Sequence, residues 1–357
     1  MDDVRNIARP PHRILIVSDA WMPQVNGVVR TLSTIAGELR AMGHVVEVIG
    51  PDRFRTIPCP TYPDIRLSIF PGRRLARLIE DFAPDRLHIA TEGPLGIAAR
   101  RWAIRHGHRF TTSFHTRFPE YLQARTNLPL GPSYAFLRRF HNASSGTMVA
   151  TASLADELRG RGFRHIVSWS RGVDLSRFSP EPRRDWAAEY GIPRPIFLYV
   201  GRIAVEKNIP AFLALDLPGS KVVVGGGPLL GELKQRFPDV VFTGPFSEAE
   251  LAAAYAGGDV FVFPSRTDTF GLVLLEALAS GVPVAAFDVT GPRDVLAGTG
   301  GAVGSVGDDL RAAALAALGA DRAACRAHAE RFGWPACAQT FLRALVPLTG
   351  ERPSVPA

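Results

Sequence analysis

The chain has 357 residues, of which 46% are hydrophobic and 21% are charged. This composition is that of a globular protein, and the length allows two domains of ordinary size. No run reaches the roughly 20 apolar residues of a membrane-spanning helix, and the first residues lack an apolar core, so we expect no signal peptide. The 3 cysteines are scattered and odd in number, which favours a reducing compartment over a disulfide framework or a zinc site.

The net charge of +7 is distributed unevenly along the chain. Residues 1–172 contain 24 Arg, no Lys and 14 acidic residues, whereas the remainder has 17 basic and 20 acidic residues. Three arginine clusters, at 73–77, 100–109 and 138–139, fall on predicted helices of the first half. A basic half is typical of a protein that meets nucleic acid or an anionic membrane, and a solvated basic face is the plain alternative.

The first elements predict a parallel sheet. An apolar run over 13–18 predicts a buried strand, and a helix over 28–42 and a strand over 45–49 follow it. This order is typical of a right-handed crossover unit. No G-x-G-x-x-G follows the first strand, which argues against a Rossmann oxidoreductase. Asn26-Gly27 instead predicts a tight turn with positive φ that leaves backbone amides exposed at the helix start.

The rest of the first half continues the alternation of strands and helices. We expect strands over 86–90, 110–114 and 147–150, and helices over 75–82, 100–109 and 154–161. His115 directly follows the strand over 110–114, at the end of the strand where open α/β sheets bind ligands. A packed or solvent-exposed histidine is the plain alternative. We expect Ser153 to cap the last helix, with Asp156 and Glu157 in its first turn.

The second half opens with a predicted strand over 195–200, and Gly201-Arg202 and Lys207 stand on the loop after it. Arginine offers a planar fork for phosphate oxygens and lysine a compact charge, so this loop suits a diphosphate. A surface ion pair between Glu206 and Arg202 is the alternative.

A strand over 221–224 leads into Gly225-Gly-Gly-Pro228, and Pro228 fits the first position of a helix. The third glycine of the dinucleotide fingerprint is missing here, so that match is weak. A short strand over 240–246 follows, and Ser247 with Glu250 predicts a capping box for the next helix.

Two carboxylates, Asp268 and Glu276, flank the start of a predicted helix over 272–279, which follows a buried strand over 258–263 and ends at Gly281. Free N–H groups and the dipole at a helix start favour an anion, so this arrangement suits a phosphate. A capped amphipathic helix is the alternative. Beyond it we expect a strand from 282, a turn over 290–293, a helix over 310–318, a terminal helix over 332–345 with Pro335 in its first turn, and a disordered tail over 350–357.

The Asp268-x7-Glu276 segment resembles the E-x7-E region of the retaining, GT-B-fold glycosyltransferases of family 4, with Asp268 where the first Glu usually stands. Further matches occur in the expected order at Asn26-Gly27, His115, Arg171-Gly-Val-Asp174, Arg202 with Lys207, and Gly225-x-Gly-Pro228. The resemblance covers roughly residues 13–346. Within this family, the chain resembles GDP-mannose-dependent alpha-mannosyltransferases and lipid glycosyltransferases.

The resemblance implies an α/β protein of the GT-B fold. Two doubly wound Rossmann-like domains would face each other across a cleft, with a C-terminal helix crossing back to the first domain. It divides the chain into an acceptor-side domain over 1–175, a nucleotide-sugar-binding domain over 176–334, and a crossover helix and tail over 335–357.

The implied activity is retaining transfer of a hexose from GDP-mannose or a UDP-hexose to a hydroxyl. The implied catalytic residues are Asp268, His115, Arg202 and Lys207. The implied donor-binding residues are Asn26, Gly27, Gly201, Gly227, Gly244, Phe270, Gly271, Leu272, Val273 and Glu276. We expect no cofactor and no metal, because positive groups of the protein would stabilise the leaving diphosphate and no D-x-D stands in a suitable place.

The expected acceptor is a membrane lipid such as diacylglycerol, and the expected location is cytoplasmic, at the inner face of the cell membrane. An anionic surface would attract the basic half, and no base-reading or base-stacking motif supports nucleic acid as a partner. The alternatives are a non-catalytic sugar-nucleotide-binding protein, a glycosyltransferase with a soluble or polysaccharide acceptor, and a hydrolysing or epimerising enzyme of the same fold.

Overall fold

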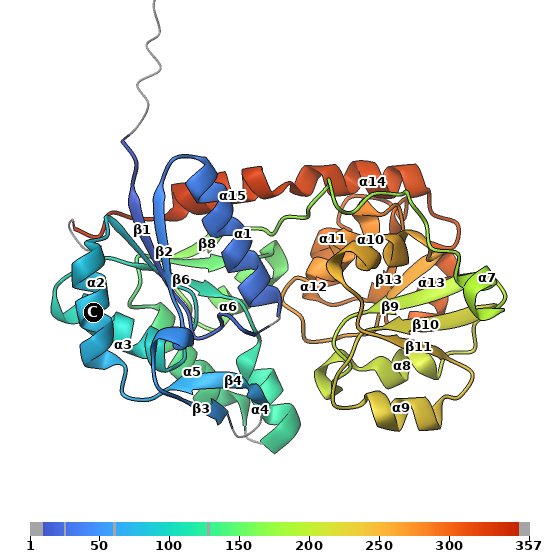
Figure 1. The fold of residues 1–357 in the computed structure, drawn as a ribbon, viewed down its shortest axis with the longest axis horizontal. Coiled ribbons are helices and arrows are strands. Elements are labelled where there is room, and N and C mark those ends of the chain that lie inside the picture. The colour runs from blue at the N-terminus through green and yellow to red at the C-terminus, as the bar shows by residue number, and fades with distance from the viewer. Residues whose placement is uncertain (1–9, 25, 60–61, 127–128, 350–357) are drawn as a thin grey trace, which may run out of the picture.

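The computed structural model describes residues 10–24, 26–59, 62–126 and 129–349, which form two parallel six-stranded sheets, one from each half of the chain (Figure 1). The first sheet has the order β2 (Val45–Ile49), β1 (Arg13–Val17), β5 (Arg86–Ile89), β6 (Thr111–Phe114), β7 (Gly146–Val149) and β8 (Ile166–Ser168). The second has the order β11 (Val241–Gly244), β10 (Ser220–Val224), β9 (Ile196–Val200), β12 (Val260–Phe263), β13 (Val284–Phe287) and β14 (Gly304–Gly307). The predicted domain boundary at residue 175 lies between β8 and β9.

Helices cover the faces of both sheets. The first half carries α1 (Gly27–Ala41), α2 (Gly72–Phe82), α3 (Pro94–Arg105), α4 (Phe118–Thr126), α5 (Leu130–His141) and α6 (Ala152–Gly160). The second half carries α7 (Trp186–Tyr190), α8 (Ile209–Leu213), α9 (Leu230–Arg236), α10 (Glu248–Ala256), α11 (Leu272–Ala279), α12 (Thr290–Val295) and α13 (Leu310–Ala317). The smaller elements are an antiparallel hairpin of β3 (Thr56–Cys59) and β4 (Tyr62–Ser68), and the 3-10 helices η1 (Pro51–Arg53), η2 (Val205–Lys207) and η3 (Glu330–Phe332).

The apolar runs form central strands because both faces of each sheet are buried. In β1, Ile14 and Ile16 pack with residues of α1, whereas Leu15 and Val17 pack with residues of α2 and α3 on the other face. All four side chains are fully buried. This two-sided burial explains why the strand is a continuous apolar run without polar alternation.

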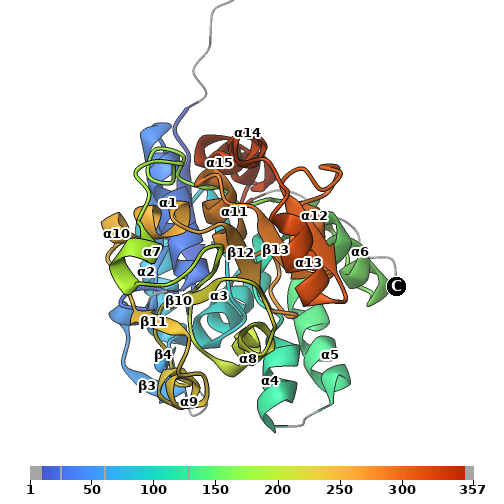
Figure 2. The same cartoon turned by 90° about the vertical axis from the view of Figure 1, so that its right-hand side faces the viewer.

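Two further helices, α14 (Arg322–Ala329) and α15 (Trp334–Ala344), run one after the other along one end of the molecule (Figures 1 and 2). Helix α14 packs on the second half, and α15 packs against α1 in the first. Pro335 lies in the first turn of α15, as the sequence predicted. The C-terminal helix thus crosses back to the first half, and the predicted fold class is confirmed.

The start of α6 differs from the prediction. Thr151 is the N-cap and accepts a hydrogen bond from the Leu154 backbone N–H at 3.3 Å. Ser153 lies inside the first turn, and its hydroxyl donates to Asp294 at 2.9 Å instead. Because the helix begins earlier than expected, Asp156 and Glu157 lie beyond its first turn.

The start of α1 also corrects an expectation. Asn26 has an extended backbone with φ of −154°, and its side-chain oxygen accepts from the N–H groups of Val28 and Val29 at 3.0 Å each. Gly27 is the first helical residue and does not have a positive φ. The pair is therefore a helix cap that occupies two amides, and no tight turn exposes them.

Other predicted boundaries were partly right. The capping box of Ser247 and Glu250 is present at the start of α10. Pro228 is not a helical residue, because α9 begins at Leu230. The segment over 290–293 is the start of α12, not a turn. The predicted tail over 350–357 lies outside the described residues.

Candidate active site

Several predicted site residues lie at or next to contacts between the two halves of the chain. Side-chain contacts that join the halves include Thr269 Oγ1 to the His115 carbonyl oxygen at 2.6 Å, Arg117 Nη2 to Thr290 Oγ1 at 3.0 Å, Ser153 Oγ to Asp294 Oδ1 at 2.9 Å, and Arg30 Nη1 to Glu276 Oε1 at 2.6 Å. The loop after β6 is therefore in direct contact with the loop after β12. These loops hold His115 and Asp268, which are 153 positions apart in the sequence.

His115 stands at the carboxyl end of β6 with one ring nitrogen bound and the other without a partner. Its Nδ1 lies 3.2 Å from Nη2 of Arg171, and its Nε2 is buried with no hydrogen-bond partner among the described residues. Burial lowers the pKa of His115 well below its usual range. The charge of Arg171 and the histidines His88 and His141 act in the same direction. The imidazole is thus neutral at physiological pH.

Asp268 and Lys207 form an ion pair across two loops of the second half. Lys207 Nζ lies 2.6 Å from Asp268 Oδ1, while Oδ2 of Asp268 is buried without a hydrogen-bond partner in the described part of the chain. Burial opposes the charge of Lys207, but Asp268, with Tyr199 and Glu206, outweighs it, and the pKa of Lys207 is raised. The sequence placed Lys207 on a diphosphate; it did not predict this carboxylate as its partner.

The loop after β9 is fixed by a hydrogen bond from the Tyr199 side chain and by the close approach of Gly227. The hydroxyl of Tyr199 donates to the carbonyl oxygen of Arg202 at 2.9 Å, which fixes the turn that begins at Gly201. Gly227 has φ of 156°, and a Cβ atom there would lie 2.3 Å from the Ile203 carbonyl oxygen. Only glycine fits this approach.

The end of β11 lies at the same edge of the second sheet. Gly244, at the end of β11, accepts a hydrogen bond from the Gly225 N–H at 2.9 Å. Gly201, Gly227 and Gly244 therefore lie on three adjoining loops at the carboxyl ends of β9, β10 and β11, the edge at which open α/β sheets bind ligands.

The start of α11 presents its backbone amides without a side-chain cap. Gly271 occupies the N-cap position with φ of 88°, and its lack of a side chain leaves the first N–H groups, those of Leu272 and Val273, uncapped by it. Phe270 is 5% exposed, and a Cβ on Gly291 would lie 2.6 Å from its carbonyl oxygen. Gly27 of the first half comes close as well, because a Cβ there would lie 3.6 Å from Leu272 Cδ1.

Glu276 lies one turn into α11 and is 4% exposed. Its Oε1 accepts from Arg30 Nη1 at 2.6 Å, and its Oε2 accepts from the Tyr255 hydroxyl at 2.8 Å. Sequence reasoning missed both partners. Arg30 is 246 positions away from Glu276. The only feature of the sequence that could have indicated Arg30 is its place one turn after the Asn26-Gly27 motif.

Comparisons with known proteins show the family to which this chain belongs. The family model for Glycosyltransferase Family 4 matches residues 25–177, and that for Glycosyl transferases group 1 matches residues 194–320. The chain is 32% identical over 308 residues to the GDP-mannose-dependent alpha-mannosyltransferase of Mycobacterium tuberculosis, covering 80% of this chain and 81% of that protein. The chain belongs to glycosyltransferase family 4. It is therefore a hexosyltransferase.

Two further comparisons concern this glycosyltransferase. It is 27% identical over 317 residues to the alpha-monoglucosyldiacylglycerol synthase of Streptococcus pneumoniae, covering 77% of this chain and 70% of that protein. Its structure resembles sucrose-phosphate synthase from Thermosynechococcus elongatus with a TM-score of 0.71 at 20% identity, over 92% of this chain and 97% of the other. The structural likeness supports the GT-B fold.

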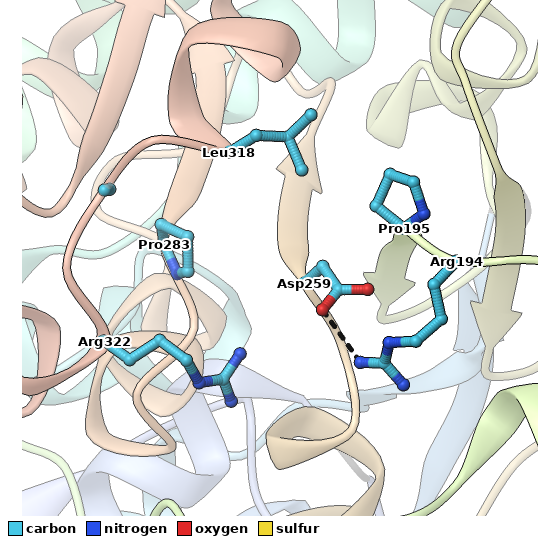
Figure 3. A pocket seen from close by; sticks show the side chains of 7 residues that line it. Arg194, Pro195, Asp259, Pro283, Leu318 and Arg322 are labelled. Carbon is cyan, nitrogen blue, oxygen red and sulfur yellow. Dashed lines mark hydrogen bonds and ion pairs between the residues drawn. The ribbon is translucent and has the colours of Figure 1, made fainter.

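The glycosyltransferase also has a hollow of about 420 Å³ that lies away from these loops (Figure 3). It is lined at the amino ends of β9, β12 and β13, opposite to the carboxyl edge of the second sheet, from which the loop with Asp268 leads. Arg194 and Asp259 form an ion pair of 2.8 Å in it. Arg322 donates to the carbonyl oxygens of Ala256 and Gly258, at 2.8 Å each. These contacts stabilise the base of the second sheet and contribute nothing to the candidate active site.

Proposed function

We propose that this glycosyltransferase moves a hexose from GDP-mannose or a UDP-hexose, with retention at the anomeric carbon, to a hydroxyl of a membrane lipid such as diacylglycerol. The observation that carries the proposal is a pair of buried polar atoms, Nε2 of His115 and Oδ2 of Asp268, that have no hydrogen-bond partner among the residues the structure describes. They belong to loops that the Thr269 hydroxyl joins across the two halves. A sugar hydroxyl both donates and accepts hydrogen bonds, so a hexose between the loops would satisfy both atoms.

The loops of the second half suit the leaving diphosphate. Lys207 and Arg202 supply positive charge on the loop after β9, and the uncapped amides at the start of α11 supply N–H donors. Electrostatic stabilisation of the departing oxygen is the largest contribution expected of such a site. Because these groups belong to the protein, we propose that transfer needs no metal ion.

Glu276 suits the ribose of the donor even though both of its oxygens have partners. A carboxylate has about four acceptor positions, and Arg30 and Tyr255 use two of them. Two positions remain for ribose hydroxyls. The two bonds also fix the direction of the carboxylate, which favours a rigid contact.

The state of Asp268 bears on how retention would be achieved, because retention needs either a nucleophile of the protein or attack on the face that the diphosphate leaves. Its pairing with Lys207 at 2.6 Å makes the carboxylate a poor nucleophile, so we propose attack by the acceptor on the same face that the diphosphate leaves. The bond from the anomeric carbon to the phosphate oxygen breaks, and a bond from the acceptor oxygen to that carbon forms. The acceptor proton passes to the departing phosphate oxygen.

A lipid acceptor is supported by the surface of the first half. The exposed arginines of the three clusters lie on α2, α3 and α5: Arg73, Arg74, Arg77, Arg101, Arg105, Arg138 and Arg139. Next to α2, Phe70 is 95% exposed and has a left-handed backbone with φ of 46°. An anionic membrane attracts each such arginine by about 1 kcal/mol, and an exposed aromatic ring gains by entering the interface. We propose peripheral binding at the cytoplasmic face; none of the helices in the described ranges is long and apolar enough to cross a bilayer.

The proposal is tested by incubating the purified protein with GDP-mannose, UDP-glucose and UDP-galactose in turn, with diacylglycerol in phosphatidylglycerol vesicles and with EDTA. We expect a glycolipid product from one donor. Binding of a nucleotide sugar without any transfer would favour a non-catalytic binding protein. Transfer only to soluble sugars or polysaccharide would replace the lipid acceptor.

Membrane binding has its own variant test. Phe70→Ser should weaken co-sedimentation with phosphatidylglycerol vesicles about tenfold, because burying such a ring is worth about 1.5–3 kcal/mol. Tyr190→Ser, at a 40% exposed aromatic of the second half, is the matched control and should bind as the unmodified protein does. Equal binding of both variants, or binding indifferent to salt, would contradict peripheral docking by this surface.

A further inference from the structure

We propose that Arg171 is a positioning residue that holds His115 as the neutral tautomer with its proton on Nε2. Arg171 would thereby fix the direction in which His115 donates a hydrogen bond to the transferred sugar. The inference rests on the proposed function, because it concerns the sugar that His115 would contact.

The tautomer follows from the chemistry of the two groups. Nη2 of Arg171 lies 3.2 Å from Nδ1 of His115, and a guanidinium has donors but no acceptor. Nδ1 must therefore accept, and the single proton of the neutral ring must sit on Nε2. That nitrogen is buried and has no partner among the described residues. It is a donor that a sugar hydroxyl would satisfy.

Arg171 is itself held in place, as a positioning role requires. It is 4% exposed, and its Nη1 donates to the carbonyl oxygens of Trp169 at 2.8 Å and Ser170 at 3.2 Å. Its guanidinium lies over the Trp169 ring, 4.1 Å from the centroid. The same ring meets the imidazole of His115 edge to face at 5.8 Å. The donor to Nδ1 therefore has little freedom to move.

Burial, and after it the charges that face His115, lower the pKa of His115 and keep it neutral. Arg171 comes from the segment after β8, His88 from β5 and His141 from α5, and each disfavours the imidazolium form. His88 is itself neutral, since burial lowers its pKa to about 3, and both of its ring nitrogens bind hydroxyl groups of β6. Arg171 is thus the permanent cation among them.

The anchor of His115 also sits where the two halves are connected. Val173, two residues after Arg171, donates its N–H to the Phe332 carbonyl oxygen at 2.8 Å and forms a bridge with Gly333. Gly172 admits no side chain, because a Cβ there would lie 2.6 Å from the Trp334 ring. The direction of the imidazole is thereby tied to the interdomain connection as well as to β6.

The experiment uses the full chain, labelled with 15N at histidine, and the variants Arg171→Met, Arg171→Lys and Arg322→Met. Arg322 is the matched control, because it is a half-buried arginine that, like Arg171, donates to two backbone carbonyls, but at the hollow of Figure 3. In the unmodified protein the 15N spectrum should show His115 protonated at Nε2 only. Arg171→Met should give a mixture of tautomers and a higher His115 pKa.

Kinetics complete the test with a readout that general destabilisation would not move. Arg171→Met should lower kcat/KM about tenfold or more, the scale of one misdirected hydrogen bond, and the acid limb of its pH profile should move to higher pH, because His115 gains a proton more readily without the charge of Arg171. Arg171→Lys should restore part of the rate, since it keeps a donor and a charge, and Arg322→Met should leave the pH profile unchanged. A proton on Nδ1 in the unmodified protein, or an unaltered pH profile in Arg171→Met, would overturn the inference. The spectrum stands even if no donor is transferred, so failure of the proposed function is seen separately.

Discussion

Breaking the ion pair of Lys207 and Asp268 should affect stability and activity by different amounts. The pair is 2.6 Å long, and the side chains are only 22% and 16% exposed. At this distance the attraction is about 6 kcal/mol at an effective dielectric constant near 20, and removing both charges from water cancels most of it. Lys207→Met leaves Asp268 with neither oxygen paired, so we expect a loss of about 3 kcal/mol in the free energy of unfolding.

Two companion variants measure the interaction free energy between Lys207 and Asp268. Asp268→Asn leaves Lys207 near Glu206, whose charge also favours the ammonium, so its cost should be about 1–2 kcal/mol. The double variant should cost no more than Lys207→Met alone, which gives a coupling of about 1–2 kcal/mol in urea unfolding. Transfer should nevertheless fall about 100-fold or more in each variant. Additive losses of stability, or near-normal turnover in Lys207→Met, would refute the reasoning.

Three further predictions test separate parts of the structure. Asp268→Asn should abolish transfer while leaving nucleotide affinity almost unchanged in calorimetry; an equal loss of both would mark Asp268 as structural. Folding depresses the pKa of His88 from 6.5 to about 3. The contribution of His88 to the free energy of unfolding is therefore complete above pH 6.5 and falls by about 2 kcal/mol between pH 7 and pH 5. His88→Gln should lack this loss, and an identical pH dependence of unfolding in the variant and the unmodified protein would contradict the prediction. Gly227→Ala should lower the thermal midpoint by several degrees, because its Cβ would meet the Ile203 carbonyl at 2.3 Å, and an unchanged midpoint would show that the loop yields.

The fold was largely predictable because its strands are buried on both faces. Runs such as 13–18 and 195–200 are continuously apolar for that reason, and short-range signals such as the Ser247 and Glu250 capping box depend only on neighbours in the chain. The hairpin of β3 and β4 was missed, because its residues lack a clear apolar alternation. The cap at Thr151 was missed because two adjoining hydroxyl residues fit the same role, and Ser153 is taken by Asp294.

The site was predictable as a set of loops but not as a network. A strand end followed by polar residues indicated His115, Lys207 and Asp268. No local pattern indicates that Arg171 binds His115, because 56 positions separate them. The contact of Arg30 with Glu276 depends on how the two halves are placed, which only the tertiary structure defines.

The most direct test of retaining transfer is the anomeric configuration of the product. Lipid-linked sugar formed from GDP-mannose or a UDP-hexose would be isolated, and the one-bond carbon–hydrogen coupling at its anomeric carbon would be measured by NMR. We predict an α-linkage, the same as that of the donor. The Lys207→Met variant should give little or no product. A β-linkage would contradict same-face attack at the site formed by His115, Asp268 and Lys207.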